Sequence, residues 1–310
     1  MPDNYQYNID KEFYSMMDSI KSKSIESITE QMLYCFKLLP LQNQAILESY
    51  YRKYPYWGTL NVSEHDLGVF VDRAMSLYSH NDDFLWLYNK LSDYRSKSVL
   101  SAIVQNWYRF RTLDSIIEKQ FSQYFDLDII KCTENEVFID VGAYIGDSVL
   151  SYLRAYGEGC YKKIYCYEIT PSSISRLKNS LSDCRDIVFR ELGVSDACEN
   201  LYISECDDIS SNQIADNGSI MVSTTTLDID LANEPTLIKM DIEGHEERAI
   251  KGAAGHIKNS KPKLAIAAYH SNTDIWKLPR LIDSINPGYE FYLRYHGSNL
   301  SPSEATLLAK

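Results

Sequence analysis

The chain divides into two parts according to how its apolar residues are spaced. From residue 11 to about residue 124, apolar side chains recur every three or four positions, which predicts a succession of amphipathic helices. From Glu136 onward, short apolar runs alternate with amphipathic segments instead. We therefore expect an all-α domain over residues 1–117 and a second domain over residues 118–310.

The second part alternates predicted strands with predicted helices. We expect strands at 137–141, 164–168, 187–191, 237–241 and 263–267, and helices at 147–155 and 171–181. Strands that alternate with helices form a mostly parallel sheet, so the predicted fold class is α/β. Because open parallel sheets bind ligands beyond the carboxyl ends of their strands, the residues that follow each strand are the first candidates for chemistry.

Glycines follow the first predicted strand and indicate a ligand-binding turn. Gly142 and Gly146 let the backbone bend sharply before a helix begins. A turn that needs glycine for its geometry alone is the simpler interpretation. Dinucleotide sites require G-x-G-x-x-G, and this chain lacks the glycine that approaches a pyrophosphate. Asp147 would also repel a phosphate at the helix start, so a cationic cofactor without phosphates fits better.

Acidic residues end two further strands. Glu168 lies about 20 residues beyond the glycine turn, where an acid accepts the ribose hydroxyls of an adenosine cofactor. Asp241 ends the fourth strand, where a cationic sulfonium and a substrate are both expected. Glu246 lies near a helix N-terminus, where a structural role is an equally good interpretation. His270 follows the fifth strand, and although a lone histidine is more often a packing residue, this one ends a strand at the same edge as Asp241.

Composition narrows the classes of partner and compartment. The 310 residues carry 43 acidic and 31 basic side chains, and most of the net charge of -12 lies after Phe125. This acidity, without extended basic runs, argues against nucleic acid as a partner. Seven cysteines without a C-x-x-C pair indicate a reduced compartment and no cysteine-ligated metal. With no predicted signal peptide or membrane span, we expect a cytoplasmic protein.

These motifs together resemble the FkbM-type S-adenosylmethionine-dependent methyltransferases, in particular the members with a helical N-terminal extension. The family pattern D-x-G-A-x-x-G-D is met by Asp140, Gly142, Ala143, Gly146 and Asp147. The later patterns T-x-L-D, K-x-D-x-E-G-x-E and D-x-W-x-x-P are met at residues 225–228, 239–246 and 274–279, and K-P-K-L-A-I at 261–266 leads to Tyr269 and His270. The resemblance covers about residues 118–309.

The resemblance implies a Rossmann-like class I methyltransferase sheet, mostly parallel with one antiparallel strand near the C-terminus, after the helical domain. It implies S-adenosyl-L-methionine as methyl donor, S-adenosyl-L-homocysteine as product, and O-methylation of a sugar, glycan or natural-product hydroxyl. Its expected cofactor-binding residues are Asp140, Gly142, Ala143, Tyr144, Gly146, Asp147, Ser148, Glu168, Ile169, Gly193, Val194 and Asp241. Its expected substrate-binding residues are Glu243, His245, Tyr269 and His270.

The catalytic group is expected among Asp241, Glu243 and His270, with His270 or Asp241 as the base and the other orienting it. A divalent metal on the same three side chains is a less favoured alternative. N- or carboxyl-methylation of a peptide or small molecule, a non-catalytic scaffold with a methyltransferase fold, and a dehydrogenase also stay open. So do three roles for the N-terminal helices, namely a lid, acceptor binding or a homodimer interface.

Overall fold

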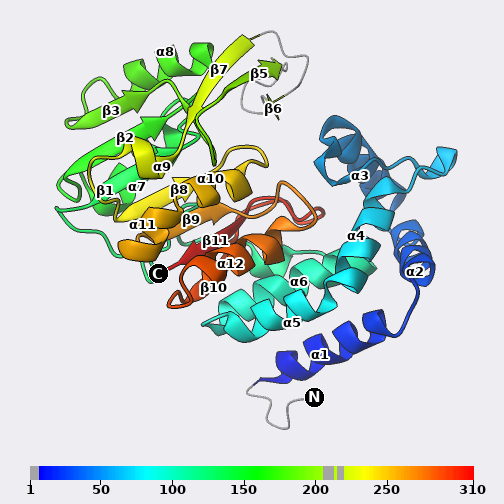
Figure 1. The fold of residues 1–310 in the computed structure, drawn as a ribbon. Helices are drawn as coiled ribbons and strands as arrows, with labels where there is room; N and C mark the ends of the chain where they lie inside the picture. The colour runs from blue at the N-terminus through cyan, green and yellow to red at the C-terminus, as the bar shows by residue number, and fades with distance from the viewer. Residues whose placement is uncertain (1–6, 205–212, 215–219) are drawn as a thin grey trace. The chain divides into compact units, whose positions relative to one another are not determined.

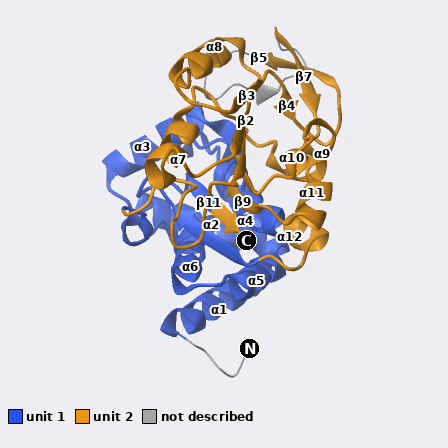
Figure 2. Ribbon diagram, turned by 90° about the vertical axis from the view of Figure 1, so that its left-hand side faces the viewer, with its two compact units in different colours: residues 1–119, 268–280, 290–306 blue, residues 120–267, 281–289, 307–310 orange. Residues whose placement is uncertain are grey.

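The structure is a computed structural model, and it describes residues 7–204, 213–214 and 220–310. The chain forms two compact units, which Figure 2 shows in separate colours. Unit 1 comprises residues 1–119, 268–280 and 290–306, and unit 2 comprises residues 120–267, 281–289 and 307–310. Unit 1 thus contains two late segments that the sequence pattern alone assigns to the second domain.

Unit 1 begins with six α-helices, drawn in blue to cyan in Figure 1. They are α1 (Asn8–Lys21), α2 (Ile25–Lys37), α3 (Leu41–Lys53), α4 (Gly68–Ser79), α5 (Asn81–Lys90) and α6 (Tyr94–Arg109). Short 3₁₀ turns lie at Pro55–Trp57, Val62–Glu64 and Asp114–Ile116. The helical prediction is wrong beyond Arg109, where only the last of these turns precedes Tyr124, because Phe110 ends α6 in a left-handed conformation with φ of 53°.

Three phenylalanine rings form the centre of the helical packing in unit 1. Phe36 of α2 lies 5.6 Å from Phe70 of α4 and 5.5 Å from Phe110, measured between ring centroids. Phe70 and Phe110 are also 5.5 Å apart. Phe36 and Phe70 are completely buried. Edge-to-face and tilted contacts of this kind add to the free energy gained by removing the rings from water.

The main sheet has seven strands in the order β10-β11-β9-β8-β1-β2-β3 and is mostly parallel, with one antiparallel edge. The strands are β1 (Val137–Val141), β2 (Lys163–Tyr167), β3 (Ile187–Arg190), β8 (Leu237–Met240), β9 (Lys263–Ala267), β10 (Phe291–Tyr295) and β11 (Ala305–Ala309). The α/β fold class and the five predicted strands are confirmed. The apolar runs identified these strands because β1 and β8 are buried along their whole length.

Helices connect the strands of the main sheet. The chain between β3 and β8 also forms a second, smaller sheet. The helices are α7 (Asp147–Tyr156), α8 (Pro171–Ser180), α9 (Leu227–Asp230), α10 (Glu246–Gly252), α11 (Ala254–Asn259) and α12 (Asp274–Ile285). The smaller sheet has the order β4-β7-β5-β6 and consists of β4 (Gly193–Val194), β5 (Asn200–Ser204), β6 (Gln213–Ile214) and β7 (Ile220–Thr225). The sequence did not predict this smaller sheet.

Two findings on cysteines and helix lengths concern the described part of the chain only. The six cysteines within the described ranges are free thiols, and Cys206 lies outside those ranges. No helix in the described part of the chain is both long enough and apolar enough to span a bilayer.

The phenylalanine cluster predicts a strong effect of Phe36→Ala on stability. Removing this fully buried ring is expected to lower the free energy of unfolding by about 3–5 kcal/mol, because it leaves a cavity as well as losing burial. Urea denaturation followed by circular dichroism measures the change. Tyr34→Ala, on the same helix but with 62% of its surface exposed, is the control and should change stability by less than about 0.5 kcal/mol. Equal losses in the two variants would contradict the packing argument.

Candidate active site

The candidate site lies where three neighbouring parallel strands of unit 2 end. β1 pairs in parallel with β2 on one side and with β8 on the other. The carboxyl ends of these strands therefore lie at one edge of the sheet. The glycine turn follows β1, Glu168 follows β2, and Asp241 follows β8. The structure thus brings together the three motifs that the sequence analysis selected.

The glycine turn passes very close to the loop after β8. A Cβ atom at Gly142 would lie 2.0 Å from the backbone carbonyl oxygen of Asp241, and Gly142 has a φ of 78°. No other residue fits this position without moving the backbone. Gly146, with φ of 91°, is the N-cap of α7, and Tyr144 between them also has a positive φ of 45°. The turn is therefore a backbone cradle next to Asp241.

A buried ion pair joins β1 to β8 directly under this turn. Asp140 and Lys239 are register partners on the two strands, and Lys239 Nζ lies 3.0 Å from Asp140 Oδ1. The two side chains form an ion pair, and this contact does not meet the geometry of a hydrogen bond. The Lys239 ammonium also donates a hydrogen bond of 2.8 Å to the carbonyl of Gly142. Asp140 Oδ2 has no hydrogen-bond partner among the described residues.

Each member of this pair shifts the pKa of the other toward the charged form. Burial raises the pKa of the Asp140 carboxyl to about 6, although the Lys239 ammonium opposes that rise. Burial lowers the pKa of Lys239, but the nearby carboxylates, Asp140 first, outweigh burial and raise it above its usual value. A cation in the middle of a buried strand requires such a partner.

Glu168 is tied to the glycine turn through its carboxylate. Oε2 accepts a hydrogen bond of 2.9 Å from the backbone N–H of Tyr144, and Oε1 accepts one of 2.7 Å from that of Thr170. The residue is 9% exposed. Each carboxylate oxygen can accept more than one hydrogen bond, so the group keeps capacity for ribose hydroxyls.

The remaining cofactor candidates surround these groups. Ile169 follows Glu168, and its Cγ2 atom lies 3.0 Å from the position of a Cβ at Gly193, so the end of β2 and strand β4 touch here. Val194 is buried next to Gly193. Ala143 is buried within the turn, whereas Asp147 is exposed at the start of α7 and Ser148 is buried behind it.

The loop after β8 is held in an unusual backbone conformation by Glu246. Its carboxylate accepts hydrogen bonds from the backbone N–H groups of Ile242, at 2.8 Å, and Gly244, at 3.1 Å. Glu243 lies between them with a φ of 55° and is half-buried. His245 is the N-cap of α10. Glu246 therefore has the structural role that the sequence left open, and it fixes the loop that carries Asp241 and Glu243.

Tyr269 and His270 belong to unit 1, where the helices hold their segment. Trp57 donates a hydrogen bond of 2.6 Å from Nε1 to the carbonyl of Tyr269, and its own carbonyl accepts one of 2.9 Å from Asn272. Arg73 of α4 in turn donates to the Asn272 side chain at 3.4 Å. His270 is 5% exposed. The substrate-binding candidates thus fall into two groups, Glu243 with His245 in unit 2 and Tyr269 with His270 in unit 1.

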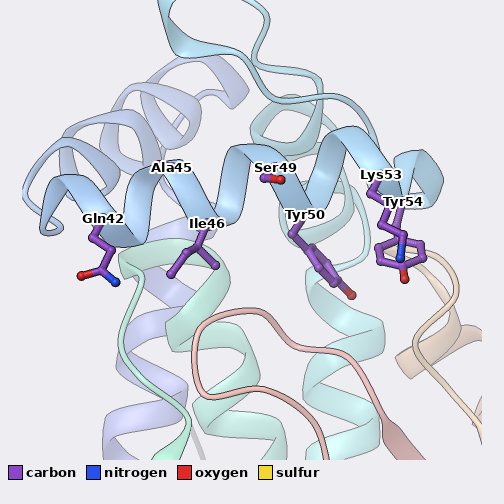
Figure 3. A pocket seen from close by; sticks show the side chains of 7 residues that line it. All are labelled: Gln42, Ala45, Ile46, Ser49, Tyr50, Lys53 and Tyr54. Carbon is purple, nitrogen blue, oxygen red and sulfur yellow. The ribbon is translucent and has the colours of Figure 1, made fainter.

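An open groove of about 500 Å³ runs along α3 in unit 1 (Figure 3). Its lining, from Gln42 to Tyr54, comes from one face of that helix and includes Tyr50 and Lys53. It contains no carboxylate or imidazole, and the neighbouring Trp57 is buried as core. The sheet edge of unit 2 is the better candidate active site.

Two side chains at that edge were given no role by the sequence analysis. Lys239 entered only as the lysine of the K-x-D-x-E-G-x-E pattern. A lysine between Ile238 and Met240 in an apolar strand nevertheless indicates that a carboxylate is buried beside it. Tyr124 donates a hydrogen bond of 2.7 Å from its phenol to Asp241 Oδ2. No sequence pattern marks it, because it lies in an irregular segment far from Asp241 along the chain.

A model of the methyltransferase FkbM domain matches residues 140–297, just over half of the 310 residues. The chain belongs to the FkbM methyltransferase family. The resemblance stated from the sequence is thereby confirmed, and the matched range contains every candidate site residue of this FkbM-family chain that the sequence analysis proposed.

One solved structure supports the fold of this FkbM-family chain. The chain is similar to the crystal structure of methyltransferase FkbM from Methylobacillus flagellatus KT, with a TM-score of 0.66, 22% identity, and coverage of 86% of this chain and 70% of that chain. A weaker similarity is to fibrillarin from Aeropyrum pernix with natively bound S-adenosyl-L-methionine, with a TM-score of 0.35, 12% identity, and coverage of 57% of this chain and 67% of that chain. None of the curated proteins matches this chain.

The buried ion pair predicts that Asp140→Asn is strongly destabilising. The substitution leaves the Lys239 ammonium buried without a counter-charge and should lower the free energy of unfolding by about 3–5 kcal/mol. Adding Lys239→Met should recover part of this loss, which a double-mutant cycle by urea denaturation measures. Glu191→Gln removes a carboxylate from the exposed pair with Lys178 and should cost no more than about 1 kcal/mol. Additive losses in the Asp140 and Lys239 variants would contradict the pairing.

Proposed function

We propose that this FkbM-family methyltransferase transfers a methyl group from S-adenosyl-L-methionine to a hydroxyl of a sugar, glycan or natural-product acceptor. The choice of methyl donor rests on one observation: the glycine turn, Glu168 and Asp241 lie at the carboxyl ends of the neighbouring strands β1, β2 and β8. These groups suit a cofactor that combines a ribose with positive charge and lacks phosphate. The acceptor class rests on the family resemblance.

The residues at the sheet edge fit this cofactor chemically. Oδ2 of Asp140 is a buried acceptor without a hydrogen-bond partner among the described residues, and it suits the ammonium group of the cofactor, directly or through water. The cradle at Gly142 admits the methionine part close to the backbone, and Glu168 offers acceptors to the ribose. Ile169 and Gly193 would border the adenine. The cofactor supplies an electrophilic methyl group on a positively charged sulfur.

Methyl transfer to a hydroxyl needs alignment and a base. The acceptor oxygen attacks the methyl carbon in line with the breaking carbon–sulfur bond, so positioning supplies much of the rate. A hydroxyl is a poor nucleophile, and we propose His270 or Asp241 as the base that takes its proton, with the other orienting it. The basis is chain order: β8 and β9 are parallel neighbours, Asp241 follows β8, and His270 follows shortly after β9. Glu243, His245 and Tyr269 are the proposed acceptor contacts.

Glu168→Ala tests the donor site without any acceptor. The variant loses the acceptors proposed for the ribose and should bind S-adenosyl-L-homocysteine at least about tenfold more weakly in calorimetry. Glu191→Ala, at the exposed end of β3, is the control and should bind as the wild type does. Circular dichroism shows whether the fold is intact. A folded wild-type protein that binds neither S-adenosyl-L-methionine nor its product would refute the proposed cofactor.

Label transfer tests the reaction itself. Wild-type protein, labelled S-adenosyl-L-methionine and an extract of the source organism should yield a labelled product, whose mass and base lability identify the methylated group. Asp241→Asn and His270→Asn should each lower the rate by about 10²-fold or more, since a general base contributes at least that much. Activity that persists in EDTA supports a side-chain base, and activity lost in EDTA and restored by Mg²⁺ or Mn²⁺ supports the metal alternative.

The same experiment separates the other candidate functions. A product methylated on nitrogen or on a carboxyl group would replace the hydroxyl acceptor while keeping the donor site. A protein that binds S-adenosyl-L-homocysteine, whose biological role survives both Asp241→Asn and His270→Asn, would be a scaffold. Stabilisation by NAD without any by S-adenosyl-L-homocysteine would indicate a dehydrogenase.

A further inference from the structure

The segment before the first strand reaches into the candidate active site of unit 2. Phe125 is completely buried, with its ring 6.0 Å from Phe138 of β1 and 5.5 Å from Tyr152 of α7. It therefore anchors the segment on the same core that supports the glycine turn. The residue before it, Tyr124, is 5% exposed and has a φ of 71°. This left-handed conformation is costly for a bulky residue, and such strain is concentrated at functional sites.

A directed hydrogen-bond chain ends on Asp241. The side-chain amide of Gln123 donates to the phenol oxygen of Tyr124 at 3.1 Å, and the phenol donates to Asp241 Oδ2 at 2.7 Å. Because the amide occupies the phenol oxygen as a donor, the phenol proton points to the carboxylate. The Lys239 ammonium also lies 5.3 Å from the centre of the Tyr124 ring, which keeps the ring in place. The Tyr124 phenol thus holds Oδ2 of the Asp241 carboxylate in place.

Asp241 is also the residue that the glycine turn approaches most closely. The contact between Gly142 and the Asp241 carbonyl places this residue beside the path proposed for the methionine part of the cofactor. A carboxylate held there attracts a sulfonium, which carries a full positive charge, and has no such attraction for the neutral thioether of the product. The difference between the two ligands is a direct measure of the carboxylate's position.

We propose that Tyr124 is a positioning residue that aims the Asp241 carboxylate at the sulfonium, so that the site favours S-adenosyl-L-methionine over S-adenosyl-L-homocysteine. This inference rests on the proposed function. When the acceptor oxygen bonds to the methyl carbon, the electron pair of the carbon–sulfur bond stays on sulfur and the positive charge disappears. The attraction to Asp241 is then lost, which favours release of the product. Asp241 acts electrostatically in this arrangement, and His270 is left as the base that accepts the hydroxyl proton.

The test compares two ligands and needs no acceptor. Calorimetry gives the dissociation constants of S-adenosyl-L-methionine and S-adenosyl-L-homocysteine for the wild type and for Tyr124→Phe, which keeps the ring but removes the phenol. We expect the ratio of the two constants to move against S-adenosyl-L-methionine by roughly tenfold, because a hydrogen bond to a charged group is lost. Tyr156→Phe is the matched control: it removes a phenol that donates to the backbone carbonyl of Ile130, and the ratio should not change.

Further variants separate a positioning role from a structural one. Asp241→Asn should shift the ratio in the same direction, and adding Tyr124→Phe to it should cause no further shift. If Tyr124→Phe does not fold, Gln123→Leu removes the donor to the phenol and should shift the ratio in the same direction by a smaller factor. An unchanged ratio, or equal weakening of both ligands, would overturn the role of Tyr124 while leaving the cofactor intact. A wild type that binds neither ligand would instead overturn the proposed function.

Discussion

The ion pair between Asp140 and Lys239 is the constraint on which the candidate active site depends. The two residues are partners in register on neighbouring strands, and both are almost fully removed from water. A buried pair of this kind contributes little net stability, because desolvation offsets most of the attraction. Its effect is geometric instead. The Lys239 ammonium also holds the carbonyl of Gly142, so the pair sets where the backbone leaves β1 and how close it comes to the end of β8.

The acids around the turn are held before any ligand arrives. Glu168 accepts a backbone hydrogen bond from Tyr144, within the turn, and Glu246 accepts two from the loop that follows Asp241. Groups fixed in this way lose little conformational freedom when a ligand binds, which is the usual requirement for a precise site. Some of the acidic residues in the second half of the chain are therefore fixed around the candidate site, where we propose that a positively charged cofactor binds.

The sequence predicted the strands and the acids at their ends because both follow from rules of topology. Buried parallel strands are continuous apolar runs, and ligands bind beyond their carboxyl ends. Strand β4 was missed because two residues, Gly193 and Val194, carry no periodicity. The contact of Tyr124 with Asp241 was missed because a left-handed tyrosine has no signature in sequence and the two residues lie far apart along the chain.

The placement of residues 268–280 in unit 1 also escaped the sequence, and it changes what the helical segment means. Trp57 donates a hydrogen bond to the carbonyl of Tyr269 and accepts one from the Asn272 side chain, which fixes the backbone on either side of His270. Arg73 of α4 donates to the same asparagine. The two contacts of Asn272 are buried, so separating the helices from this segment would leave polar groups without partners. The helices and His270 therefore form one body. If unit 1 moves as a whole toward an acceptor, we therefore expect His270 to move with the helices.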